Sequence, residues 1–129
     1  MAQYADIVDI VAPGEAQAGS RVDITVKVKN TYSAAIGILV GGALEYGVSP
    51  WPGISFAEPS TNVNGGATHS FAGYFIMPDK KVTIHAYSYY YGADGSWHFD
   101  DEMTKVVNLA EVVASQFGSI EIVSYERRL

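Results

Sequence analysis

The sequence contains no cysteine, and this absence excludes disulfide bonds, thiolate metal sites and cysteine nucleophiles together. Basic residues are also few, with 8 lysines and arginines against 14 acids, so the formal net charge is −6. Phosphate binding needs clustered basic side chains, and the sequence offers only short pairs at 80–81 and 127–128. We therefore expect no nucleic acid partner.

Long hydrophobic runs are missing as well. No segment approaches the roughly 18 consecutive apolar residues of a membrane-spanning helix. The opening stretch, "MAQYADIVDIVAPG", has neither the basic leader nor the apolar core of a secretion signal. We expect no membrane insertion, and no signal peptide in this chain.

Motifs that mark catalysis are not found either. The sequence has no G-x-S-x-G, no H-E-x-x-H, no phosphate-binding loop and no glycine-rich dinucleotide turn. Two acids on neighbouring strands could in principle form a glycosidase pair, and a small glycosidase or metal-dependent hydrolase would depend on Asp100 or Asp101. A short chain without an evident cleft disfavours this, so we expect no enzymatic activity and no cofactor.

The dominant pattern that is present has a period of two. Hydrophobic residues make up 48% of the chain and charged residues 17%, which is enough apolar material for the core of one domain. In segment 21–30, "RVDITVKVKN", apolar and polar residues alternate from Val22 to Lys29. This alternation predicts a strand with one face in the core.

Further strands are predicted in the segments 5–12, 34–40, 70–77, 81–91, 96–109 and 119–126. Clusters of Gly, Pro, Asn and Asp separate them, which is typical of an antiparallel β-sandwich; we expect about seven to nine strands. Segment 12–20 is expected to be a turn, and the proline-rich segment 46–66 a long, mostly irregular connection. At most one short helix is expected, near 108–117.

Aromatic residues gather in segment 85–102, "HAYSYYYGADGSWHFDDE". In a strand over 82–91, Val82, Ile84 and Ala86 mark the core face, so His85 and three tyrosines point outward. The Asp-Gly pair in "GADG" predicts a hairpin that brings the next strand alongside. The residues that we predict to form a binding or interface surface are Tyr87, Tyr89, Tyr91 and Trp97, with Trp51 and Phe56 from the 46–60 loop.

Two interpretations of this stripe compete with a protein contact. Tyrosine, phenylalanine and tryptophan favour strands, so they could cover a sheet face without any ligand. The same rings could instead form a flat surface for a sugar. These three alternatives stay open on the sequence alone.

The acids and histidines of the same segment invite a metal hypothesis. Oxygen ligands at 100–102 would suit calcium, but their spacing does not match a calcium loop, and we favour an exposed strand end kept soluble by charge. His85 and His98 could lie near each other across the hairpin, yet a clear third ligand for zinc is missing. We expect no metal site.

Two stretches are similar to a known family of modules. Segment 12–30, "APGEAQAGSRVDITVKVKN", and segment 65–90, "GGATHSFAGYFIMPDKKVTIHAYSYY", resemble immunoglobulin-like modules of the CARDB and bacterial Ig-like type. The resemblance covers roughly 5–109 and implies an immunoglobulin-like β-sandwich. Such modules occur in cell-surface proteins and in virion proteins of tailed phages, and the family has no shared catalytic residues.

We therefore expect a non-enzymatic structural or assembly protein: a virion component (decoration, tail or capsid-associated) or another unit of an extracellular surface. Its partner would be a second copy or another structural protein. The alternative is a carbohydrate-binding module that uses the same aromatic residues for a glycan. The Ig-like domain is predicted to span 1–110. The extension 111–129 would hold a final strand that either completes the sheet or pairs with a neighbouring subunit.

Overall fold

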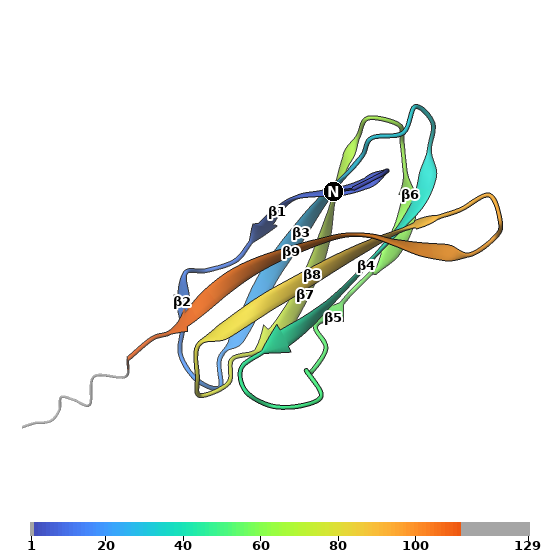
Figure 1. Ribbon diagram of the computed structural model, residues 1–129. Coiled ribbons are helices and arrows are strands. Elements are labelled where there is room, and N and C mark those ends of the chain that lie inside the picture. The colour runs from blue at the N-terminus through green and yellow to red at the C-terminus, as the bar shows by residue number, and fades with distance from the viewer. Residues whose placement is uncertain (1, 112–129) are drawn as a thin grey trace, which may run out of the picture.

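Two β-sheets packed face to face form the protein, as the computed structural model of residues 2–111 shows (Figure 1). The strands are β1 (Ala5–Val11), β2 (Glu15–Ala16), β3 (Arg21–Asn30), β4 (Ile36–Glu45), β5 (Ser55–Phe56), β6 (Ser60–Val63), β7 (Thr68–Ile76), β8 (Val82–Tyr91) and β9 (Trp97–Leu109). One sheet has the order β1-β3-β7-β5 and the other the order β2-β9-β8-β4-β6. All pairs are antiparallel except β2 with β9. The predicted all-β sandwich of seven to nine strands is confirmed.

Alternating side chains build the core between the sheets. On β3, Val22, Ile24, Val26 and Val28 are all buried, and their neighbours on β7 include Phe71 and Phe75. Strand β8 contributes Val82, Ile84 and Ala86 from the opposite sheet. These are the faces that the period-two pattern assigned to the interior, and apolar burial of this kind is the main force that holds two sheets together.

Several short or interrupted elements differ from the sequence prediction. Strand β4 continues through Gly41 and Gly42 to Glu45, beyond the predicted end at residue 40. Segment 46–66 is more regular than expected, because β5 pairs with β7 and β6 with β4. Strand β2 lies inside the predicted turn 12–20. Strands of two to four residues are too short to show an alternating pattern, which is why the sequence did not predict them.

The helix predicted near 108–117 does not begin where expected, since Asn108 and Leu109 are the last residues of β9. The remainder of that segment from residue 112 and the predicted strand 119–126 lie outside the described residues. Between residues 2 and 111 there is no helix, and so none long and apolar enough to cross a membrane.

The acids at 100–102 lie inside β9, and the first two of them tie the sheets together. Ser88 of β8 pairs with Asp101 and Tyr89 pairs with Phe99, so Asp100 is the extra residue of a β-bulge. Its carboxylate accepts hydrogen bonds from the main-chain N–H groups of Gln3 (2.6 Å), Tyr4 (2.8 Å) and Ala5 (2.6 Å).

The neighbouring carboxylate continues this contact along the edge of β1. Asp101 Oδ2 accepts from the N–H of Ile7 at 2.9 Å. The expectation of a merely exposed, solubilising strand end is therefore corrected. These two carboxylates satisfy N–H groups at the beginning of the β1 edge that faces away from β3, and they join that edge to β9.

Candidate functional site

The β8–β9 hairpin places a row of aromatic side chains on the outward face of the five-stranded sheet. Its register sets Tyr91 opposite Trp97 and Tyr89 opposite Phe99, with ring centroids 5.2 Å and 5.7 Å apart. The turn between the strands includes Gly95 at a φ of 80°, a conformation that glycine adopts without strain. The predicted hairpin and the outward direction of the tyrosines thus match the structure.

Further ring contacts extend this row across the sheet. Tyr87 lies 6.2 Å from Phe99 and 6.4 Å from His85, and His85 stacks on Trp51 at 4.4 Å with 26° between the planes. We call the resulting surface the aromatic face; it consists of Trp51, His85, Tyr87, Tyr89, Tyr91, Trp97 and Phe99. Five of the six predicted interface residues belong to it.

Much of the aromatic face is accessible to solvent. Phe99 keeps 57% of its surface exposed, Tyr91 48%, Trp51 43% and Trp97 40%. Tyr87 and Tyr89 are half-buried among these neighbours. A contiguous group of exposed large apolar side chains is the usual mark of a contact surface, whereas single exposed apolar residues are ordinary.

The sixth predicted residue, Phe56, lies elsewhere. It belongs to β5, pairs with Gly73 of β7 in the four-stranded sheet, and packs partly buried against the core. The 46–60 loop thus contributes Trp51 to the aromatic face and Phe56 to the other sheet. The grouping of Phe56 with the tyrosines is corrected, because the loop crosses from one sheet to the other between these two residues.

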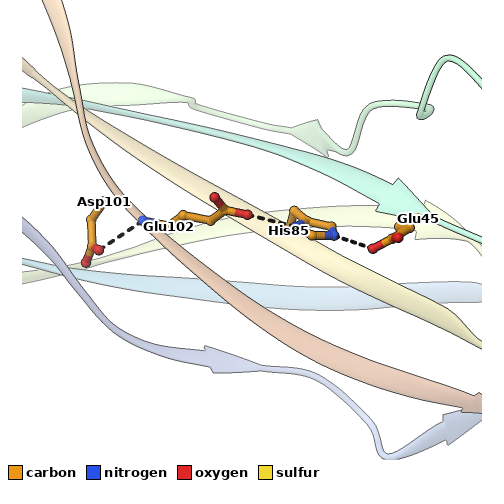
Figure 2. A network of polar contacts seen from close by, with 4 residues as sticks. All are labelled: Glu45, His85, Asp101 and Glu102. Carbon is orange, nitrogen blue, oxygen red and sulfur yellow. Dashed lines mark hydrogen bonds and ion pairs between the residues drawn. The ribbon is translucent and has the colours of Figure 1, made fainter. Parts of the chain in front are cut away.

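His85 occupies the middle of a polar network within the aromatic face (Figure 2). Its Nδ1 lies 2.8 Å from Glu102 Oε2 on β9, and its Nε2 lies 2.8 Å from Glu45 Oε1 on β4. A carboxylate can only accept hydrogen bonds, so an imidazole that satisfies both partners carries a proton on each nitrogen. The network therefore favours the protonated form of His85.

The pKa of His85 reflects two opposing causes. Burial of the ring, whose side chain is only 12% exposed, acts to lower the pKa. The hydrogen bonds and negative charges of Glu102 and Glu45 act against it and together outweigh it, so the pKa of His85 is raised above 6.5. A charged imidazole also attracts the face of the indole that covers it, which anchors Trp51 and its loop.

Tyr87 shares this environment. Burial raises the pKa of its phenol above the usual 10.0, and the charges of Glu102, Tyr89 and Glu45 act in the same direction. The phenol therefore stays neutral and able to donate a hydrogen bond at physiological pH. Tyr87 is thus a neutral neighbour of His85.

Two adjacent glycines of β4 differ sharply in the space around them. A Cβ at Gly41, which pairs with Tyr87, would meet nothing within 4 Å. A Cβ at Gly42 would come within 2.8 Å of Ile54 Cδ1 and 3.2 Å of the His85 main-chain oxygen. Gly41 thus leaves an open position beside the tyrosine row.

The two histidines of the hairpin are not neighbours. His98 pairs with Tyr90, which points to the opposite side of the sheet from His85, and its Nε2 lies 2.9 Å from Asp94 Oδ1. The hydrogen bond from His98, and then those from Ser96, hold the pKa of Asp94 below its usual range. The expected closeness of His85 and His98 is corrected. Within residues 2–111, no three His, Asp or Glu side chains gather as they would around a metal ion.

The residues of this site that were not among the predicted interface residues are His85 and Phe99, with the pair Glu45 and Glu102. The position of Phe99 on the same face as Trp97 was visible in the alternation. The two glutamates gave no such signal, because their contacts with His85 join residues 40 and 17 positions apart.

The sequence matches no family model and no curated protein. Solved structures with similar folds do exist. The CARDB domain of a Pyrococcus furiosus protein, solved in complex with di-metal ions, superposes with a TM-score of 0.57 at 10% identity, covering 85% of this chain and 92% of that one. Its likeness supports the immunoglobulin-like β-sandwich.

Two larger proteins contain a similar domain. The alkylpurine DNA glycosylase of Pseudomonas fluorescens, bound to DNA with an abasic-site analogue, gives a TM-score of 0.54 at 12% identity over 81% of this chain. A cycloisomaltooligosaccharide glucanotransferase of Paenibacillus gives a TM-score of 0.53 at 21% identity over 84% of this chain. The present chain spans 30% of the glycosylase and 15% of the transferase. At these identities the likeness shows the fold alone.

Proposed function

We propose that this protein is a non-enzymatic assembly module that binds a structural protein, or a second copy of itself, through the aromatic face. The observation that carries the proposal is the aromatic face itself, in which ring contacts run from Trp51 to Tyr89 and the pair Tyr91–Trp97 lies next along the same hairpin, with four members at least 40% exposed. Tyrosine and tryptophan offer large contact areas at a low cost in conformational entropy, so they dominate the energetics of protein interfaces.

The geometry of the rings favours a protein partner over a sugar at this surface. Neighbouring rings meet at 60° to 74° in the pairs Tyr87–Phe99, Tyr91–Trp97 and Tyr89–Phe99. The two rings of each such pair do not lie in one plane, so one sugar cannot stack on both; only His85 lies nearly parallel to its neighbours, at 18° to Tyr87 and 26° to Trp51. An uneven surface with an open position at Gly41 suits interdigitating protein side chains better.

The setting that we propose is a repeated assembly, in which the module is of the CARDB type and decorates or spaces a virion or a cell surface. The sequence resemblance and the acidic charge of −6 support this setting, because a net charge keeps free subunits soluble until they meet their partner.

The experiment that tests the proposed interface is light scattering over a concentration series, combined with a substitution that blocks the surface without disturbing the core. Gly41→Arg would place a long charged side chain in open space beside Tyr87. We expect wild type to form a defined oligomer, and Gly41→Arg to weaken its association at least about tenfold, a change of roughly 1.4 kcal/mol. The triple variant Tyr87→Ser, Tyr89→Ser, Tyr91→Ser should give a folded monomer.

The control is Gly14→Arg, since a Cβ at Gly14 also meets nothing within 4 Å and Gly14 lies off the aromatic face. It should leave the association unchanged. A wild type that remains monomeric at every concentration would exclude self-association and restrict the proposal to a different structural protein. An oligomer that survives Gly41→Arg and the triple variant would contradict the proposed interface.

A further inference from the structure

A concave site apart from the aromatic face is lined partly by the β8–β9 hairpin. The turn of this hairpin projects past the neighbouring strands at one end of the sandwich (Figure 1). The site is a groove with a volume of about 440 Å³, within the range of roughly 300–1,000 Å³ typical of small-molecule sites. Its lining comes from the N-terminal segment, the β3–β4 loop, β4, β6 and the hairpin. The side chains that the argument uses are Tyr4, Tyr32, Asn62, Tyr90 and Tyr91.

Three of these tyrosines form one corner of the groove. Tyr4 meets Tyr32 edge to face at 5.1 Å and Tyr90 edge to face at 4.9 Å. Tyr90 is held from behind by His98, whose ring stacks on it at 5.2 Å and 27°. The hydroxyl of Tyr90 also lies 3.4 Å from Gln3 Oε1. Contacts on several sides fix the ring of Tyr90 in place.

Tyr4, whose ring meets that of Tyr90 in this corner, is fixed through its main chain. The main-chain N–H of Tyr4 donates to Asp100 Oδ2 at 2.8 Å, and the N–H groups of Gln3 and Ala5 donate to the same carboxylate. The bulge of β9 therefore anchors one wall of the groove. A wall that is ordered before binding lowers the entropic cost of holding a ligand.

The lining is uncharged, although the protein as a whole carries a formal charge of −6. None of its ten residues is an acid, a lysine, an arginine or a histidine. Its hydrogen-bonding groups are phenol hydroxyls, the amide of Asn62 and the main chain. Such a lining gives no compensation to a charged ligand, which would lose its hydration on entering.

We propose that this groove binds one end unit of a neutral carbohydrate. A pyranose ring combines an apolar C–H face with a rim of hydroxyl groups. Tyrosine offers the matching pair of an apolar ring and a polar tip, and an amide can both donate to and accept from a sugar hydroxyl. The site is separate from the assembly surface except for Tyr91, which borders both.

A proline-rich peptide fits this groove less well. Recognition of such peptides uses an extended aromatic-lined groove that takes successive turns of a polyproline helix. Here the three rings are in mutual contact and form a single corner, which offers a place for one ring-shaped group.

The test is an NMR titration of the full ¹⁵N-labelled chain with glucose, galactose, mannose, N-acetylglucosamine and their disaccharides, and with glucuronate as a charged match for glucose. We expect at least one neutral sugar to bind at millimolar concentration and to shift the amide signals of Tyr4, Tyr32, Asn62 and Gly92. Glucuronate should bind at least about tenfold more weakly than glucose if glucose is the ligand.

Two substitutions and a control make the result specific to the groove. Tyr32→Ala removes an exposed wall, and Asn62→Ala removes the amide; each should lower the affinity at least tenfold while the protein stays folded. The control Tyr74→Ala removes a comparably exposed tyrosine from the other sheet and should leave binding unchanged. Three results would overturn the proposal: no neutral sugar shifts these signals, the shifts fall on the aromatic face, or both variants bind as wild type does.

Discussion

At the scale of single residues, His85 makes the aromatic face sensitive to pH. Hydrogen bonds to Glu102 and Glu45 raise its pKa against the effect of burial, and the groups packed around it are those two glutamates, Trp51 and Tyr87. Because the folded-state pKa lies above that of an unfolded histidine, about 6.5, protonation of His85 stabilises the folded protein. This stabilisation is fully present below pH 6.5 while the glutamates stay ionised, and it is lost as the pH rises through the folded-state pKa.

We predict that the free energy of unfolding, measured by urea denaturation at successive pH values, falls over that window in wild type. His85→Gln should flatten the decrease, since glutamine carries no titrating proton. The matched variant His69→Gln changes a histidine on the other sheet, and its free energy of unfolding should still decrease with pH as in wild type. An identical pH profile in wild type and His85→Gln would show that the network does not contribute to stability.

Asp100 is the residue whose loss should cost the fold most for its degree of exposure. Its carboxylate accepts three main-chain N–H groups from the segment that leads into β1, and Asp100→Ala would leave all three without this partner. Hydrogen bonds to a charged group contribute about 1.5–3 kcal/mol each, but water can replace part of them at this half-buried site. We predict a loss of about 2–4 kcal/mol in the free energy of unfolding.

Chemical denaturation of Asp100→Ala against Asp23→Ala would check this value. Asp23 pairs with Arg21 on the surface, where its side chain is 75% exposed, so its removal should change the stability by no more than about 0.5 kcal/mol. Equal effects of the two substitutions would mean that the carboxylate does not hold the edge of β1.

At the scale of strands, the two glycines of β4 offer a matched comparison. Gly41→Ala should be neutral or stabilising by about 0.5 kcal/mol, because the new methyl group enters open space and the unfolded chain loses freedom. Gly42→Ala should destabilise by about 1 kcal/mol or more, because its Cβ would press on Ile54 and on the main chain of β8. Thermal or urea denaturation of the two variants should thus give opposite signs. A stable Gly42→Ala protein would mean that Ile54 moves aside freely.

The strands differ in how well their sequence predicted them. Strands β3, β7 and β8 alternate over nine or ten residues, and this repetition determined both their existence and their buried faces. Strand β4 carries two glycines at its centre, which hide its pattern, and β2 and β5 have two residues each. Short strands form because they hydrogen-bond to a longer neighbouring strand. Their own few residues do not show which distant strand this will be.

The candidate site, like the strands, was predicted from the sequence only in part. The outward direction of Tyr87, Tyr89 and Tyr91 follows from period two, and the Asp-Gly turn predicted that Trp97 comes back beside them. Contacts that depend on the packing of distant segments could not be predicted, such as the stack of Trp51 on His85 and the binding of the β1 edge by Asp100. The latter joins residues 95 positions apart.

At the scale of the whole molecule, residues 2–111 contain a set of contacts that closes both edges of the sandwich near β1 and β2. Strand β1 is held to β3 by its ladder and to β9 by Asp100 and Asp101, and β2 pairs with the end of β9. We therefore predict that a fragment ending at Glu111 folds alone, with a Tm within a few degrees of the full chain. Differential scanning calorimetry of both proteins checks this.

The same fragment separates two routes to assembly. If the aromatic face mediates association, the fragment keeps the oligomer of the full chain, because every residue of that face lies between 51 and 99. A fragment with an unchanged Tm that becomes monomeric in light scattering would instead assign the contact to residues 112–129, as in the hypothesis of a strand added to a neighbouring subunit. Gly41→Arg in the full chain would then leave the oligomer intact, so the two variants together distinguish a face-to-face contact from an exchanged terminal segment.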